Sequence, residues 1–130
     1  MASGKIERLK NEILVEDDEL DGVYLKNPTA YAGTVTFAYL RRSGNVIFLS
    51  VHMLVNGPIS AKSLTTLFWL DPSVRPAAAM RAVAFASSTA EAVGVVSVGN
   101  SSPQISFAPT EAIAEGGTLG IRFSFTYIAA

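Results

Sequence analysis

The sequence predicts an all-β fold for most of this 130-residue chain, with an antiparallel β-sandwich or jelly-roll-like domain over residues 34–130. Short apolar segments, many of them alternating with polar residues, recur along the chain between clusters of Gly, Pro, Asn and Ser. No helical periodicity is found after Gly33. Seven or eight short strands at this spacing are typical of sandwiches and jelly rolls, and the length suits one domain with a sizeable core.

The segment SGKIERLKNEIL predicts a short N-terminal helix. Ser3 is a suitable N-cap, and Ile6, Leu9 and Ile13 recur at spacings of three and four residues. The stripe is as narrow as a coiled-coil seam and ends at Glu16, so the helix has about two turns and needs a partner to be stable. The first 33 residues are therefore expected to form a helix and an irregular connection.

The acidic segment DDELDG after this helix partly matches a calcium-binding loop. Asp17, Glu19, Asp21 and Gly22 stand at the first, third, fifth and sixth positions of such a loop. The twelfth position, which should be a bidentate Glu, is Pro28. We therefore interpret the segment as a solvated helix exit and predict no metal site.

The β pattern begins at Thr34, where Val35, Phe37 and Tyr39 alternate with smaller residues. The strongest strand is VIFLSVHMLV, whose odd positions form an unbroken apolar face. Pro58 after Asn-Gly lacks the N–H that closes a two-residue hairpin, so an open loop is expected there. Further strands are predicted at Ile59–Leu70, Met80–Ser88, Ala92–Val98, Gln104–Ala108 and Thr118–Ile128.

The charge distribution excludes some classes of partner. Three Lys/Arg and seven Asp/Glu lie between Met1 and Asp21, whereas seven Lys/Arg and four Asp/Glu follow. The later basic residues are scattered, with only Arg41 and Arg42 adjacent, which does not indicate a nucleic-acid surface. The absence of cysteine excludes disulfides, thiolate metal sites and cysteine nucleophiles.

The mean hydropathy of +0.34 is high for a soluble domain. Ser43–Ala61 and Ala92–Thr110 are each 19 residues long and carry no Lys, Arg, Asp or Glu. Both contain turn-forming residues, so we expect no membrane insertion. The surplus apolar surface is instead expected to face another protein chain.

No catalytic constellation is visible, and we predict neither an enzyme nor a cofactor. The single histidine, His52, lies inside the strongest strand, and no G-x-S-x-G elbow is present. A glycosidase needs two carboxylates held together. The acids after Asp21 lie in apparent loops, and nothing in the sequence pairs them; they are Asp71, Glu91, Glu111 and Glu115.

Saccharide sites combine an aromatic face with planar hydrogen-bonding groups, and the best-clustered candidates surround FWLDPSVRP. They are Trp69, Asp71, Arg75 and Arg81, with His52 as a further candidate. Trp69 also ends an apolar strand, which favours core packing. Asp71 and Arg75 also suit a second role, pairing across the connection and bracing it.

Four segments together resemble the C-terminal receptor-binding domains of bacteriophage tail-fibre and baseplate proteins. They are RRSGNVIFLSVHML, LFWLDPSVRPAAAMRAVAF, VGVVSVGNSSPQISF and GIRFSFTYIAA. The resemblance covers roughly Val35 to Ala129, and LDPSVRP stands where LP.G.RP is common.

This resemblance implies a homotrimer in the virion, assembled in the host cytoplasm and attached to other tail or baseplate proteins. Its tip would recognise a saccharide of the bacterial surface. Two alternatives remain open: a structural tail adaptor or trimerisation module that binds no sugar, and a glycan-degrading enzyme.

Overall fold

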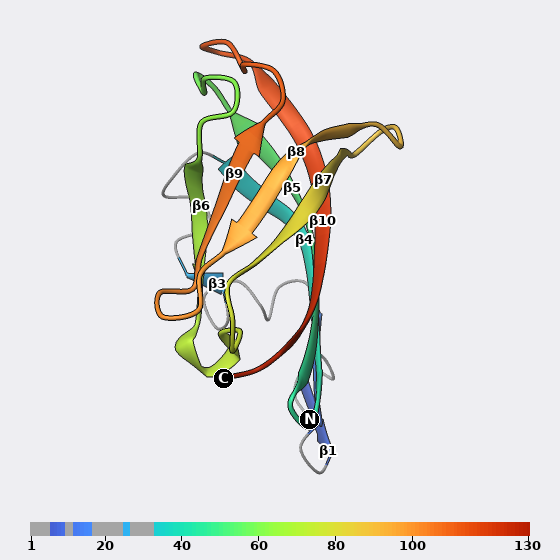
Figure 1. Ribbon diagram of the computed structural model, residues 1–130. Coiled ribbons are helices and arrows are strands. Elements are labelled where there is room, and N and C mark those ends of the chain that lie inside the picture. The colour runs from blue at the N-terminus through green and yellow to red at the C-terminus, as the bar shows by residue number, and fades with distance from the viewer. Residues whose placement is uncertain (1–5, 10–11, 17–24, 27–32) are drawn as a thin grey trace.

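The computed structural model describes residues 6–9, 12–16, 25–26 and 33–130, and these form an antiparallel all-β structure (Figure 1). This confirms the predicted class. One turn of 3₁₀-helix, η2 (Pro72–Val74), joins β6 to β7. The strands are β1 (Ile6–Leu9), β2 (Glu12–Glu16), β3 (Leu25–Lys26), β4 (Gly33–Ser43), β5 (Val46–Asn56), β6 (Thr65–Leu70), β7 (Met80–Ala86), β8 (Ala92–Val98), β9 (Gln104–Pro109) and β10 (Thr118–Ile128).

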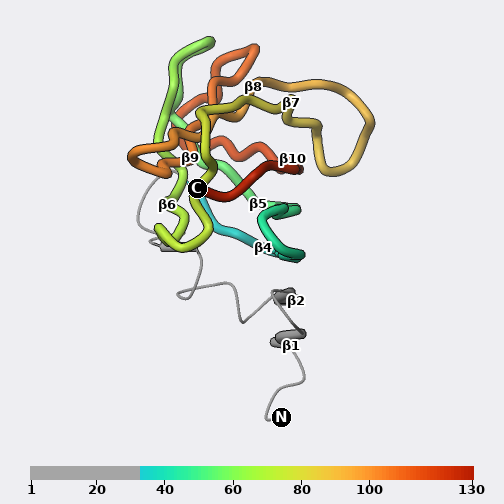
Figure 2. Tube along the Cα trace, turned by 60° about the horizontal axis from the view of Figure 1, so that its bottom comes forward, coloured from blue at the N-terminus to red at the C-terminus, as the bar shows by residue number. Residues whose placement is uncertain are grey.

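The strands hydrogen-bond into one sheet in the order β1-β2-β4-β5-β10-β7-β8-β9-β6-β3. Between β4 and β6 this sheet curls strongly, so that β4, β5 and β10 face β8, β9 and β6 across the core (Figure 2). The pairing is continuous through β7, and it does not divide the strands into two separate sheets. The finer prediction of a sandwich or jelly roll is therefore not confirmed by the pairing.

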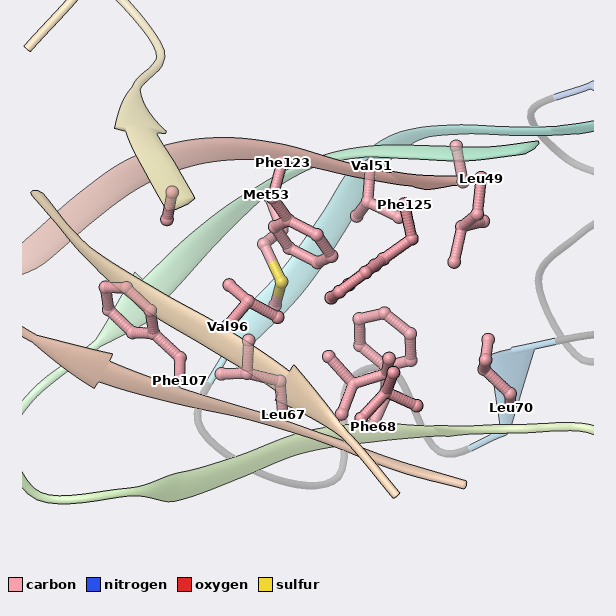
Figure 3. Close-up of a cluster of buried hydrophobic side chains, with 14 of the residues drawn as sticks. Leu49, Val51, Met53, Leu67, Phe68, Leu70, Val96, Phe107, Phe123 and Phe125 are labelled. Atoms are coloured by element: carbon pink, nitrogen blue, oxygen red, sulfur yellow. The ribbon is translucent and has the colours of Figure 1, made fainter. Parts of the chain in front are cut away.

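The hydrophobic core fills the inside of the curl, where alternate side chains of the facing strands meet (Figure 3). The rings of Phe68 on β6 and Phe123 on β10 stack with centroids 6.5 Å apart, and Phe125 meets Phe123 edge-on at 6.0 Å. The odd positions of β5 are all buried, as their pattern predicts. The apolar face predicted for β10 is also buried: Ile121, Phe123, Phe125 and Tyr127.

The prediction of an N-terminal helix is wrong for the part of that segment that the structure describes. β1 and β2 pair with each other, and β2 pairs with the second half of β4, from Tyr39 to Ser43. A helix of two turns is marginal on its own, whereas the edge of β4 offers a row of free backbone donors and acceptors. The proposed N-cap Ser3 and the acidic segment at positions 17–22 lie outside the described residues.

A β-bulge in β4 changes which side chains face the core. The pairing with β5 shifts between Val35 and Phe37, and the Thr36 hydroxyl donates a hydrogen bond to the His52 carbonyl at 3.1 Å. After the bulge the alternation is inverted, so Phe37 and Tyr39 point away from the core. The buried positions are then Ala38 and Leu40.

The molecule has two distinct ends (Figure 1). One end, which we call the η2 end, holds the connection from β6 to β7, the β4–β5 turn and the C-terminus. The opposite end, which we call the loop end, carries the connections β5–β6 (57–64), β7–β8 (87–91) and β9–β10 (110–117). The open loop expected after Asn56 lies here.

Candidate functional site

The sequence-predicted saccharide residues fall into separate places. Trp69 is half-buried in β6, where it pairs with Lys26 and Gln104. Asp71 and Arg75 flank η2 as its N-cap and C-cap residues. These three residues therefore share the η2 end of the molecule.

The other two predicted residues lie on strands. Arg81 is exposed near the start of β7, opposite Ser97 of β8. His52 lies on β5 between Phe37 and Arg122, and its ring meets that of Phe37 edge-on at 5.4 Å. Their roles in saccharide binding stay a prediction, but the fold does not gather all five around one cavity.

The connection around η2 is held in place by many contacts. The Asp71 carboxylate accepts hydrogen bonds from the Ser73 amide at 3.0 Å and from the Ser73 hydroxyl at 2.5 Å. The Val74 side chain is buried, and its carbonyl accepts a hydrogen bond from the Tyr127 hydroxyl at 2.6 Å. Arg42 donates to the Ser73 carbonyl at 3.1 Å. These contacts are those of a braced structural turn.

The pKa of Tyr127, which lies on β10, is clearly displaced. Burial of the phenol raises this pKa far above the usual tyrosine value, and the positive charge of Arg42 acts in the opposite direction. The hydroxyl therefore keeps its proton and acts as a permanent donor to the Val74 carbonyl. Its function in the fold is to fasten the last strand to the η2 connection.

The outward side chains of β4, β5, β10 and β7 form an unusually apolar surface, which we call the outer face. It carries Phe37, Phe48, Leu54 and Val83, each 39–48% exposed. Tyr39 packs edge-on against Phe48 with ring centroids 6.0 Å apart. Other outer-face residues include Arg41, Val46, Ser50, His52, Arg81, Phe85, Arg122, Ser124, Thr126 and Ile128.

A small notch opens in the outer face because β7 pairs with β10 only at Ile121–Ala86 and Arg122–Phe85. Its volume is about 130 Å³, and its lining includes Ser50, His52 and Arg122. The Arg122 guanidinium lies over the Phe85 ring at 5.4 Å. Ligand pockets usually occupy about 300–1,000 Å³, so this notch is too small for a saccharide unit.

A larger pocket of about 440 Å³ lies at the loop end, between the start of β8 and the β9–β10 connection. Its apolar lining includes Val93, Ile113 and Leu119, of which Ile113 is buried. Two exposed acidic residues, Glu91 and Glu111, are among the residues that line it. Thr110 and Thr118 add hydroxyl groups. We call this the loop-end pocket, and its size suits one or two sugar units.

From the sequence, Glu91 and Glu111 could be identified only as acids in apparent loops. The pairing of β8 with β9, from Gly94–Pro109 to Val98–Ile105, places the residues before β8 and after β9 at the same end of the sheet. The available signal was that each Glu lies a few residues beyond a strand end. This position predicts a shared pocket only once the pairing of β8 with β9 is known.

Within the described part of the chain, no three His, Asp or Glu side chains gather as a metal site would require. The same residues contain no helix of the length and apolar character that would let it cross a membrane. Comparison of the chain with known protein families and with curated proteins finds no match.

Proposed function

We propose that this chain is a receptor-binding domain of a bacteriophage tail-fibre or baseplate protein, which acts as a homotrimer and recognises a saccharide of the bacterial surface. The virion is its site of action, after assembly in the host cytoplasm, and its other partners are tail or baseplate proteins. Support comes from the resemblance of four sequence segments to such domains and from two features of the surface.

The observation that carries the proposal is the combination of an apolar outer face with a separate polar-rimmed pocket. Exposed aromatic and aliphatic side chains that share one face of a sheet are typical of protein contacts. Phe37, Phe48 and Leu54 would be covered if copies of the chain met through this face. The loop-end pocket would then remain free to bind a ligand. In this arrangement the curled sheet serves as a jelly-roll-like subunit.

We prefer the loop-end pocket to the η2 connection as the saccharide site. The connection uses the Asp71 carboxylate and the Ser73 and Val74 carbonyls in its own hydrogen bonds. The pocket, in contrast, offers carboxylates and hydroxyls beside an apolar wall, which is the usual composition of a small-molecule site.

The test is to measure the mass of the purified chain by light scattering, its binding to a panel of bacterial surface glycans and its adsorption to bacterial cells. A trimer that binds glycan or cells is the expected result. A monomer at micromolar concentration contradicts the homotrimer. A trimer that binds no saccharide and no cell contradicts the receptor-binding role and favours the adaptor alternative.

The glycan-degrading alternative has one observation in its favour, because Glu91 and Glu111 line the same pocket. Glycosidases do use two carboxylates. However, both residues are exposed, whereas reacting groups usually sit in a site that excludes water. Release of reducing ends from bacterial glycan by the purified chain would support this alternative, and loss of that release in Glu111→Gln would assign it to the pocket.

A further inference from the structure

We infer that the loop-end pocket recognises an amine-bearing saccharide, one in which a sugar carries a protonated amino group. This inference rests on the proposed function, and it names the class of ligand for the same pocket. It follows from three properties of the pocket: its charge, its apolar wall and the fixed geometry of its loops.

The charge of the pocket is negative. Among the residues whose side chains the structure describes, its lining includes Glu91 and Glu111 and no Lys, Arg or His. Carboxylates only accept hydrogen bonds, and an ammonium group is a compact donor of three. A charge-assisted hydrogen bond between the two is roughly twice as strong as a neutral one. The same carboxylates repel uronic acids and phosphorylated sugars, so the site discriminates by charge.

The apolar wall of the pocket suits the carbon-bound hydrogens on one face of a sugar ring. The wall is formed by Val93, Ile113 and Leu119, which also pack in or against the hydrophobic core. The lining also includes three small apolar residues, Ala92, Ala112 and Ala114. Carbon-bound hydrogens on a pyranose face are apolar and can be buried against such a surface. Thr110 and Thr118 are available to ring hydroxyls as donors or acceptors.

The backbone around the pocket is held by its own hydrogen bonds. Ile59 and Ile113 exchange two of them, at 2.9 and 2.8 Å, which ties the β9–β10 connection to the β5–β6 connection. The Thr110 amide donates to the Val93 carbonyl at 2.9 Å. The Gly117 amide donates to the Ala114 carbonyl at 2.8 Å. A pocket fixed in this way loses little conformational entropy when a ligand enters.

The experiment uses saccharides in matched pairs that differ only in whether the amine is free or N-acetylated. A β-1,4-linked glucosamine tetramer with its N-acetylated counterpart is one pair, and an oligogalacturonate is the anionic probe. We expect calorimetric titration of the full chain to show binding of free-amine members and at least tenfold weaker binding of their acetylated partners. Oligogalacturonate should not bind, and raising the pH until the amine loses its proton should abolish the preference.

Variants assign the binding to the pocket. Glu91→Gln and Glu111→Gln should each weaken binding of the amine about tenfold, the factor expected for loss of one charge-assisted contact at a half-open site. Glu115→Gln is the matched control, because Glu115 is an exposed acid of the same connection but does not line the pocket. Ala112→Trp should fill the pocket and abolish binding with an unchanged melting temperature.

Three outcomes overturn the inference. They are failure of every free-amine saccharide to bind, equal binding of acetylated partners, and full binding by Glu91→Gln and Glu111→Gln. If the chain still adsorbs to bacterial cells in any of these cases, the receptor-binding function stands and only the ligand class or its site is wrong. If adsorption is absent as well, the proposed function fails with it.

Discussion

Tyr127 illustrates how a single polar side chain holds two distant segments of this fold together. It belongs to the last strand, yet its hydroxyl donates to the carbonyl of Val74 in the η2 connection. Both groups are shielded from water, and among the described residues no buried side-chain polar atom lacks a partner. A hydrogen bond in such a setting is costly to break, because the remaining carbonyl cannot turn to solvent.

We expect Tyr127→Phe to lower the free energy of unfolding by about 1–2 kcal/mol, since it leaves the buried Val74 carbonyl without its donor. Urea denaturation at neutral pH measures the loss. Tyr39→Phe is the matched control, because it removes a hydroxyl from a half-buried side chain of the outer face. Equal stability of Tyr127→Phe and the wild type would show that the hydrogen bond contributes nothing.

The pH dependence of this variant is a separate expectation. Burial raises the pKa of the folded Tyr127, so its contribution is complete below the unfolded-state value of about 10 and is lost as the pH rises beyond it. The wild type should therefore lose stability above about pH 10 more steeply than Tyr127→Phe does. Parallel curves for the two proteins in urea between pH 8 and pH 11 would contradict this.

Variants of Asp71 and Arg75 can decide whether the η2 connection binds saccharide or only braces the fold. Asp71→Ala removes the N-cap contact to the Ser73 amide and should cost about 0.5–2 kcal/mol of stability without changing adsorption to cells. Arg75→Gln, at an exposed position, should change neither quantity. Melting curves and adsorption assays on both variants test this. Loss of adsorption at an unchanged melting temperature would return the saccharide site to this connection.

The outer face raises the question of assembly at the level of elements. β5 and β10 bury one face completely and still expose aromatic and aliphatic side chains on the other. Phe48 stands opposite Arg41 and Thr126 on this face, close to the β4–β5 turn. Its side chain takes no part in the core, so a substitution there should change association and leave the subunit folded.

We expect Phe48→Glu to convert the proposed trimer into a folded monomer. A charge introduced into an apolar contact loses its hydration when copies meet, and three copies would also repel one another. Light scattering measures the mass, and circular dichroism checks that the subunit is folded. Ser101→Glu, at an exposed position of the β8–β9 turn, adds the same charge away from the outer face. An intact Phe48→Glu trimer would show that copies meet elsewhere.

The N-terminal hairpin is a second element with a testable role. β1 and β2 lie at the edge of the sheet, and the core residues whose side chains the structure describes, in residues 33–130, already form a continuous cluster. Deletion of residues 1–21 should therefore leave a folded trimer with a somewhat lower melting temperature. If the shortened chain is a folded monomer, the deleted segment is needed for association.

The sequence predicted several elements well where local pattern decided them, although the strand predicted from Ile59 begins only at Thr65. The bounds of β8 and β10 follow the alternation of Val and aromatic residues, and Pro58 correctly ruled out a two-residue hairpin after Asn56. Two features, the N-terminal strands and the bulge in β4, depend on pairing with other strands, which a local sequence pattern does not reveal. The helix expected around Ile6 is replaced by strands at the edge of β4, and the bulge at Thr36 inverts the alternation beyond it.

The candidate site was the least predictable feature because it depends on the whole molecule. The curl brings the loops after β5, β7 and β9 to one end, where Glu91 and Glu111, which flank the paired strands β8 and β9, share a pocket. Closure of the curl depends on long-range packing such as the stacking of Phe68 on Phe123. Trp69, whose local pattern predicted core packing, lies half-buried in β6, and its role in saccharide binding stays a prediction.

At the scale of the assembly, adsorption to cells should depend on the number of pockets as well as on their affinity. Three weak sites on one rigid tip can exceed the affinity of one site by a factor of about 10²–10⁴. The monomeric Phe48→Glu chain keeps its loop-end pocket intact, because Phe48 is on the outer face and does not line it. We therefore expect unchanged affinity for a soluble saccharide but adsorption weakened by about 10² or more.

Fusing the Phe48→Glu chain to an unrelated trimeric coiled coil tests whether the loss of adsorption comes from the loss of multivalency. The fusion restores three pockets to one particle without restoring the outer-face contact, so adsorption should recover if multivalency is the cause. Ser101→Glu should adsorb like the wild type throughout. Recovery would mean that the outer face serves binding by assembling the pockets. Persistent loss of adsorption in the trimeric fusion would mean that Phe48 or its surroundings contact the receptor directly, and the saccharide site would then have to be sought on the outer face around Phe48.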